Sequence, residues 1–397
     1  MQQSRDLRIG ATIFVASLSL SIFGCILLVW QESRGLALFL SVLLMLAVSI
    51  RFSFLRHLVA SKRLAGLMLA LATLNLVVVV PELALRVVGF RGESGIQFGY
   101  PRPENFVALE PDPRLFWKLR SSNPNVNSLG FPGHEIAIPK PKDRYRILFL
   151  GDSCTQQGYP DIVEVLLNGS HADNGRRIES ITLAVSGYSS HQGRVLAELY
   201  GERLEPDLAV VYFGWNDHWQ AYQAVDAQRV APAPPSPWAK RLAFFQQFRL
   251  LQGLESLSTS LGSANRPIGE VRVPRAQYQE NLLAIQRVFE RRSVPVVFIS
   301  APTSHYRLGV PDYLVERNFV PNKPFSVTIH RDYNQIVREV AAGAPGSYLL
   351  DLEREFESRE DLGAIFTRDG IHFTEAGLAL VATRVSEFLG EHVFAHN

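Results

Sequence analysis

Long apolar runs gather in the first ninety residues of this 397-residue chain and limit what that part can fold into. Residues 9–30 and 64–80 contain no charged side chain, and residues 35–55 contain only Arg51. A bilayer core of about 30 Å is crossed by roughly 20 residues of helix. The runs also lack the polar face that a surface helix of a soluble protein turns to the solvent. The sequence therefore predicts a membrane anchor over residues 1–90, all α, with three transmembrane helices at about 9–30, 35–55 and 64–88.

The cationic residues of the short loops predict the orientation of this anchor. They gather before the first run and around the second connection: Arg5, Arg8, Arg51, Arg56, Lys62 and Arg63. Both groups belong on the cytoplasmic side, so everything after residue 90 is expected outside the cytoplasm. The localisation predicted is the cytoplasmic (inner) membrane, multi-pass, with the C-terminal part on the periplasmic side and the lipid bilayer as a partner. A cleaved signal peptide is the alternative for the first run, but two more runs follow it.

Composition excludes several classes of protein. Forty Lys and Arg against 38 Asp and Glu give a net charge of +2, which argues against a nucleic-acid binder. With two cysteines, of which Cys25 lies in an apolar run and Cys154 does not, no disulfide framework is expected. The ten histidines show neither HxxxH spacing nor a Cys/His cluster, so no metal site is predicted. No cofactor is predicted either.

Residues 91–145 are rich in Pro, Gly and Asn and are predicted as a linker and N-terminal extension of a catalytic domain. From residue 146 to 397, short apolar strands alternate with helices. The predicted strands cover residues 146–150, 181–185, 208–213, 294–300 and 348–351, and the predicted helices cover 161–167, 192–204, 275–292 and 375–389. This alternation predicts a parallel five-stranded sheet covered on both faces.

Residues 219–273 interrupt that rhythm and are interpreted as an insertion. The segment holds four prolines between residues 232 and 237, and Phe and Leu residues recur between Phe244 and Leu254. Three interpretations stay open for it: an ordinary packed helix, a lid or acyl-binding wall over the site, and a surface that touches the bilayer.

The domain contains a serine, a histidine and an aspartate in positions suited to nucleophilic catalysis. Gly151-Asp152-Ser153 comes directly after the first predicted strand, at the edge of a parallel sheet where ligands bind. A serine nucleophile needs a base, and the base needs an orienting group. Asp369 stands three residues before His372, so one short loop can supply both the carboxylate and the imidazole.

Acyl transfer also needs donors for the developing oxyanion. Asn216 follows the third predicted strand and offers a side-chain amide at the same edge. Gly187 follows the second, and a glycine there lets a backbone N–H approach closely.

The order Gly-Asp-Ser, a glycine block, Gly-x-Asn-Asp and Asp-x-x-His resembles the SGNH (GDSL-type) hydrolase superfamily over about residues 145–390. The stretches Asn127 to Phe131 and Gly187 to Ser190 are similar to its membrane-attached or secreted bacterial branch. The resemblance implies a three-layer α/β/α domain. It also implies roles: Ser153 as nucleophile, His372 as base with Asp369 as its partner, and the Ser153 N–H, the Gly187 N–H and Asn216 as oxyanion-hole donors.

Three functions follow as hypotheses. The first is a membrane-anchored, extracytoplasmic serine esterase that cleaves acyl esters, acetyl or lipid, through an acyl-Ser153 intermediate. The second is an O-acyltransferase that modifies a surface or exported polysaccharide and takes its acyl donor from a membrane or polysaccharide-export partner. The third is a non-catalytic glycan-binding or assembly protein, which the intact residue set opposes. If His372 is the base, activity should rise near pH 6.5, the ordinary histidine range.

Overall fold

The computed structural model describes residues 73, 75–90, 96–97, 100–101, 109–170, 175–230, 248–261 and 267–394. The chain forms two compact units. Unit 1 comprises Met1–Ser94 with Ser236–Gly262, and unit 2 comprises Gly95–Pro235 with Ser263–Asn397. The segment predicted as an insertion is thus shared: its middle belongs to unit 1, and its two ends belong to unit 2.

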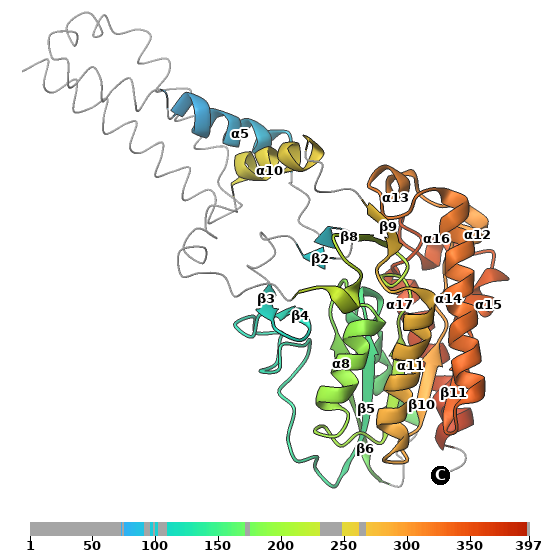
Figure 1. Cartoon of the computed structure of the whole chain (residues 1–397). Helices are drawn as coiled ribbons and strands as arrows, with labels where there is room; N and C mark the ends of the chain where they lie inside the picture. The colour runs from blue at the N-terminus through green and yellow to red at the C-terminus, as the bar shows by residue number, and fades with distance from the viewer. Residues whose placement is uncertain are drawn as a thin grey trace, which may run out of the picture. The chain divides into compact units, whose positions relative to one another are not determined.

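A parallel five-stranded sheet forms the centre of unit 2, as the sequence predicted (Figure 1). Its order is β11 (Ser347–Leu350), β10 (Val296–Ile299), β7 (Leu208–Tyr212), β5 (Arg144–Gly151) and β6 (Arg177–Ala184), and every neighbouring pair is parallel. Strand β5 runs between two partners and is buried on both faces, which explains its unbroken run Ile147-Leu148-Phe149-Leu150. The carboxyl ends of these strands define one edge of the sheet.

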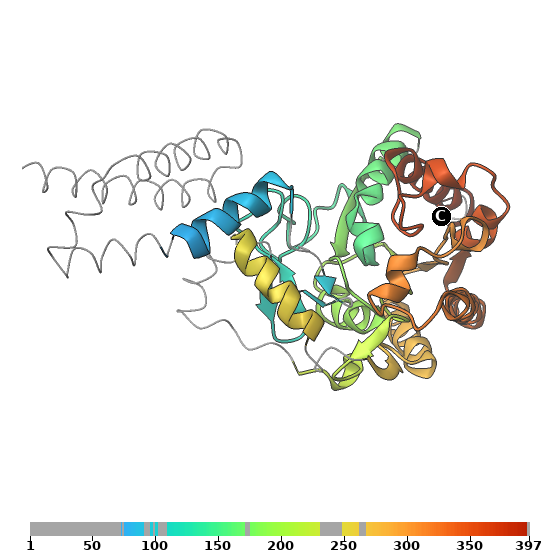
Figure 2. The same ribbon diagram turned by 90° about the horizontal axis from the view of Figure 1, so that it is seen from above.

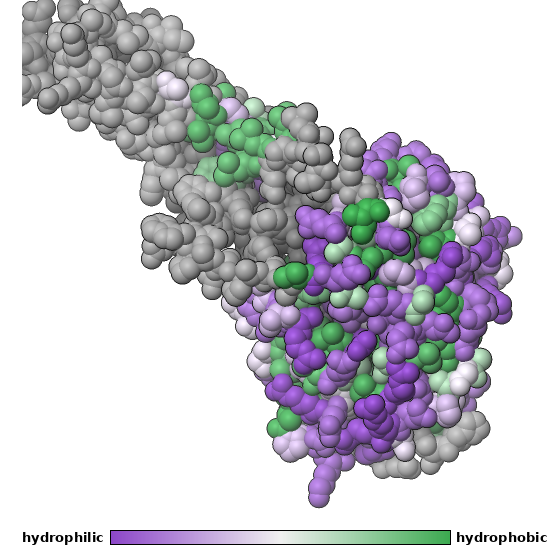
Figure 3. Space-filling model, viewed as in Figure 1, coloured by the Kyte–Doolittle hydropathy of each residue, from purple (hydrophilic) through white to green (hydrophobic). Residues whose placement is uncertain are grey.

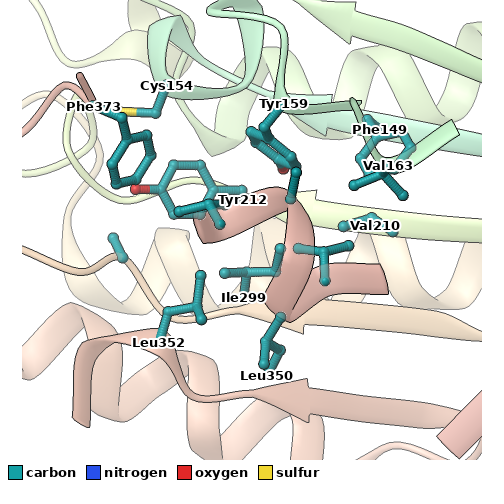
Figure 4. Close-up of a cluster of buried hydrophobic side chains, with 14 of the residues drawn as sticks. Phe149, Cys154, Tyr159, Val163, Val210, Tyr212, Ile299, Leu350, Leu352 and Phe373 are labelled. Carbon is teal, nitrogen blue, oxygen red and sulfur yellow. The ribbon is translucent and has the colours of Figure 1, made fainter. Parts of the chain in front are cut away.

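The two faces of the sheet carry separate hydrophobic cores. Successive side chains of β5 point to opposite faces, so Ile147 and Phe149 join one cluster while Leu148 and Leu150 join the other. Figure 4 shows part of the first cluster, where Phe149 lies beside Val163 and Tyr159. Phe149 is fully buried, so its truncation to alanine should cost about 3–5 kcal/mol.

Helices cover both faces and complete a three-layer α/β/α fold (Figures 1 and 2). The first core is covered mainly by α7 (Tyr159–Ser170) and α17 (Glu375–Leu389), and the second by α8 (Ser190–Tyr200), α11 (Arg275–Glu290) and α14 (Lys323–Gly343). Smaller helical segments of unit 2 are α6 (Ser153–Gln156), η3 (Asp226–Gln228), α12 (His305–Leu308), α13 (Asp312–Glu316), α15 (Leu352–Glu357), α16 (Leu362–Ile365) and η6 (Gly390–Phe394).

The predicted elements lie close to the observed ones, and α17 matches its predicted range residue for residue. The 21-residue helix α14 was not predicted. Its buried face includes polar side chains such as His330 and Asn334, which hide its apolar periodicity.

Among the described residues, three antiparallel strand pairs lie outside the central sheet. The residues before β5 contribute β1 (Ile96–Gln97) with β2 (Tyr100–Pro101), and β3 (Leu109–Asp112) with β4 (Phe116–Leu119). The third pair, β8 (Gln220–Tyr222) with β9 (Pro267–Val271), joins the two ends of the predicted insertion. The hairpin β3–β4 buries Leu115, Phe116 and Trp117 in the second core, so this part of the extension is an integral piece of unit 2.

Unit 1 is described through η1 (Asn75–Val79), α5 (Val80–Val87) and α10 (Arg249–Leu261). The fully buried Glu82 carboxylate links the two α-helices: it accepts from Arg86 Nε at 2.7 Å and from the backbone N of Leu250, at the start of α10, at 2.7 Å. Where Gly253 lies, an added Cβ would touch Leu85 and Phe90 at 3.8 Å. Helix α10, which comes from the predicted insertion, therefore packs against α5.

The predicted transmembrane helices at 9–30 and 35–55 lie outside the described residues, and the third, 64–88, is described only in part. Within the described part of the chain, no helix has both the length and the apolar character needed to cross a bilayer.

Candidate active site

Ser153 lies on a sharp turn between β5 and α6. Asp152 is the N-cap of α6, and its Oδ1 accepts from the backbone N of Cys154 at 2.9 Å. Gly151 makes the turn possible, because a Cβ there would lie 2.0 Å from Oγ1 of Thr155. Ser153 is the first residue of the helix, so its N–H has no acceptor within the helix and remains available to an oxyanion.

The structure brings Ser153, His372 and Asp369 together. His372 Nε2 lies 2.7 Å from Ser153 Oγ, and His372 Nδ1 lies 2.6 Å from Asp369 Oδ2. When Nδ1–H donates to the carboxylate, Nε2 carries the lone pair that accepts the serine hydroxyl proton. This is the tautomer that a general base for Ser153 needs.

A tight loop holds the acid and the base. Asp369 Oδ1 accepts from the backbone N of Ile371 at 2.8 Å, from that of His372 at 2.9 Å and from Oγ1 of Thr367 at 2.8 Å. An isolated antiparallel bridge between Phe366 and Phe373 closes the loop at its base. The carboxylate is therefore fixed by four donors and is preorganised for the imidazole.

These contacts move the pKa values of both partners. Burial alone would raise the pKa of Asp369, but the hydrogen bond and charge of His372 and the backbone donors outweigh it and hold that pKa well below 3.8. Burial alone would lower the pKa of His372, but the hydrogen bond and charge of Asp369, together with the charge of Asp152, raise it above 6.5. The base is thus stronger than a free histidine.

Gly187 lies in the loop after β6 with φ of +86°, a conformation that favours glycine. The preceding residue is tied to the nucleophile helix, because Ser186 N and Oγ both donate to Oε1 of Gln156, at 2.6 and 2.8 Å. The second-strand loop and the serine turn therefore lie side by side.

Asn216 connects the ends of three strands. Its Nδ2 donates to the carbonyl of Tyr188 at 3.0 Å and to Oδ2 of Asp152 at 3.3 Å. The side chain is placed beside the serine turn, as the sequence predicted. Its amide hydrogens, however, are engaged by protein acceptors in this structure, so an oxyanion would have to replace the longer bond to Asp152.

The carboxyl of Asp152 supports the serine turn and also affects the electrostatics of the site. It is almost fully buried, and burial, opposed by the Cys154 hydrogen bond and the charge of His372, raises its pKa to about 6. The negative charge of Asp152 helps to raise the pKa of His372, so the two residues are electrostatically coupled.

His305 is a further residue that the sequence did not reveal. Its Nε2 lies 2.7 Å from the carbonyl of Asp369, and Oγ1 of Thr303 donates to the carbonyl of Gly370 at 2.9 Å. Both residues follow β10, so a fourth strand end supports the acid loop. Their position just after a predicted strand could have placed them near the site, since parallel strands present their carboxyl ends at one edge of the sheet.

No group of three or more His, Cys, Asp or Glu side chains in the described part of the chain is arranged to hold a metal ion. What the site can do is nucleophilic acyl transfer by an activated serine hydroxyl.

Residues 149–380 match the family model described as the GDSL-like lipase/acylhydrolase family. The search of curated proteins gave no match. Among solved structures, the lipase/acylhydrolase from Enterococcus faecalis is 18% identical, with a TM-score of 0.38, over 62% of this chain and 94% of that chain. A GDSL-like lipase from Bacteroides thetaiotaomicron is 15% identical, with a TM-score of 0.40, over 65% and 93%. An acetyl xylan esterase is 16% identical, with a TM-score of 0.38, over 61% and 98%.

Proposed function

The chain belongs to the GDSL-like lipase/acylhydrolase family and is an ester-hydrolysing serine hydrolase, and on that premise we propose that it works through an acyl-Ser153 intermediate. The observation that carries this mechanism is the contact of 2.7 Å between His372 Nε2 and Ser153 Oγ. It places the base within reach of the proton that the nucleophile must lose.

The reaction then has two halves. Ser153 Oγ attacks the ester carbonyl while His372 Nε2 takes the hydroxyl proton, and the imidazolium is stabilised by Asp369. The tetrahedral oxyanion accepts from Ser153 N–H, Gly187 N–H and the Asn216 amide. Collapse breaks the bond to the alcohol oxygen, which receives the proton from His372. A water molecule, deprotonated by the same imidazole, then attacks the acyl carbonyl. The bond between the acyl carbon and Ser153 Oγ breaks, Oγ takes the proton back from His372, and the carboxylic acid leaves.

The substrates proposed are acetyl esters of glycans or lipid esters presented at a membrane surface. The decisive experiment compares the wild type and Ser153→Ala in detergent on p-nitrophenyl esters from acetyl to palmitoyl, with a fluorophosphonate label in parallel. Ser153-dependent turnover supports the hydrolase, and its chain-length preference separates an acetyl esterase from a lipase. Labelling without turnover indicates a live nucleophile that lacks its acceptor, as an O-acyltransferase would. If a folded sample shows neither turnover nor labelling, the catalytic proposal is overturned and a binding role is left.

A membrane anchor is part of the proposal. The apolar runs before residue 80 support it, and so does α10, which exposes Leu251, Leu254 and Leu257 by 43%, 54% and 57% while it packs against α5. Figure 3 shows hydrophobic colouring over these two helices and a largely hydrophilic surface over unit 2 on the visible face.

Alkaline carbonate extraction of membranes tests the anchor, because an integral protein stays in the pellet. Protease treatment of oriented inner-membrane vesicles tests the side, and unit 2 should be cut only when the periplasmic face is exposed. Release into the supernatant would contradict the membrane anchor. Cleavage from the cytoplasmic face would contradict the periplasmic location of unit 2.

A further inference from the structure

Two buried side chains from outside the Gly187 loop bind the peptide groups on either side of this residue. Trp117 Nε1 donates to the carbonyl of Ser186 at 3.2 Å, and Arg272 Nη1 donates to the carbonyl of Gly187 at 2.9 Å. Trp117 belongs to strand β4 of the N-terminal hairpin, and Arg272 follows β9 at the base of the insertion. Neither belongs to the four sequence blocks that predicted the site.

Arg272 is held by a buried ion pair. Its Nε and Nη2 lie 3.2 and 2.8 Å from the two carboxylate oxygens of Asp226, and both side chains are fully buried. The backbone joins the same residues, because Asp226 N donates to the carbonyl of Arg272 at 2.8 Å. A guanidinium fork clamped in this way has no freedom to turn, so the nitrogen that reaches Gly187 is fixed in place.

The same carboxylate also reaches the residue that begins helix α8. Ser189 Oγ lies 2.7 Å from Oδ2 of Asp226, and Ser189 is the N-cap of α8. The loop from Ser186 to Ser189 is therefore bound by Asp226 at its end, by Arg272 at its middle and by Trp117 at its start.

These contacts matter because of what a glycine with φ of +86° can do. Glycine has the largest conformational freedom of any residue, so the direction of the Gly187 N–H must be set by its neighbours. The Ser186 carbonyl belongs to the same rigid peptide plane as that N–H, and a donor on the carbonyl fixes the plane and polarises the N–H. The guanidinium fixes the next plane.

We propose that Trp117 and the Arg272–Asp226 pair are positioning residues that aim the Gly187 N–H at the oxyanion. This inference rests on the proposed hydrolysis through Ser153. It assigns a part in catalysis to the hairpin and to the base of the insertion, which would otherwise be structural additions to the domain.

The test uses the full-length protein in detergent with Trp117→Phe, which removes the indole N–H and keeps an aromatic ring, and Arg272→Lys, which keeps a cation for Asp226 but lacks the fork. We expect kcat for p-nitrophenyl acetate to fall about 10-fold or more in each, with KM within about twofold, since loss of a whole oxyanion donor costs about 100- to 1000-fold. A boronic acid that forms a tetrahedral adduct on Ser153 should bind more weakly by the same factor, while product carboxylate inhibition should not change.

Gln286→Leu is the matched control, because it also deletes one buried donor to a backbone carbonyl, that of Pro345, at 3.2 Å. Its kcat should equal that of the wild type. If Arg272→Lys fails to fold, Trp117→Phe carries the test.

Three results would overturn the positioning role: wild-type kcat in a folded Trp117→Phe, equal weakening of the boronic acid and the carboxylate, or an equal loss of kcat in Gln286→Leu. Ser153→Ala separates this from the larger proposal. Wild-type turnover that survives Ser153→Ala overturns both, whereas Ser153-dependent turnover with unaffected variants overturns only the positioning role.

Discussion

His372 binds both oxygens of the Asp369 carboxylate, through its ring Nδ1 at 2.6 Å from Oδ2 and through its own backbone N at 2.9 Å from Oδ1. The three-residue step thus makes the acid a cap for the loop as well as a partner for the ring. One carboxylate sets the position of the base, its tautomer and its charge.

The Asp369→Asn variant should fold like the wild type but lose catalytic activity. The amide can still accept from the backbone, but its NH₂ faces Nδ1 and favours the wrong tautomer of His372. We expect kcat to fall by about 10⁴-fold, as in other Ser-His-Asp triads. Asp361→Asn, an exposed partner of Arg359, is the control and should leave kcat unchanged. A loss below about 10-fold would show that Asp369 does not orient the base.

The pH profile should report the raised pKa of His372. The neutral ring is the base, so kcat/KM rises with pH through that pKa, and the midpoint should lie above the value of 6.5 that the sequence alone predicted. Asp152→Asn removes a negative charge that favours the imidazolium, so the midpoint should move to lower pH. Initial rates with p-nitrophenyl acetate at constant ionic strength measure both midpoints. A midpoint that stays in place in Asp152→Asn would contradict the electrical coupling.

Gly187→Ala should lower kcat by about 10- to 100-fold with little change in KM. A Cβ at φ of +86° costs about 1–2 kcal/mol and turns the peptide that carries the donor. Gly175→Ala is a matched control, because Gly175 has φ of +83° and open space around it. Both variants carry the backbone strain of a residue with positive φ, and only Gly187→Ala should lose turnover. Equal kcat in the two variants would argue against Gly187 N–H as a donor.

Asp217→Asn should flatten the pH dependence of stability. Burial, opposed by the hydrogen bonds of Ser190 and the charge of Arg272, raises the pKa of Asp217 to about 7. A carboxyl whose pKa is higher in the folded state than the ordinary 3.8 destabilises the fold as pH rises from about 4 to 7, by up to about 4 kcal/mol. Between pH 5 and pH 8 the wild type should therefore lose more stability than the variant. Urea unfolding at pH 5 and pH 8 compares them, and parallel losses would refute the shift.

The sheet and the triad were predictable from sequence for local reasons. Central strands such as β7 are continuous apolar runs, and Asp369 and His372 belong to one short loop. The order of the strands was not predictable, because it depends on contacts between distant segments. Helix α14 escaped prediction because residues such as Asn334, whose Oδ1 accepts from Ala301 N at 2.7 Å, are polar and buried.

The contacts around the oxyanion donors could not be predicted from local sequence patterns either. The sequence placed Asn216 at the right edge, but its bonds to Tyr188 and Asp152 arise only when three strand ends meet. The hydrogen bonds of Trp117 and Arg272 join segments 69 and 85 residues apart from their acceptors. No spacing rule links such residues.

Cys154 follows the nucleophile and is completely buried, and burial together with the charge of Asp152 raises its thiol pKa well above the ordinary value of 9.0. Alkylating agents and peroxides attack the thiolate, which this side chain almost never forms. We therefore expect the thiol beside Ser153 to be protected from iodoacetamide and from peroxides in the folded protein.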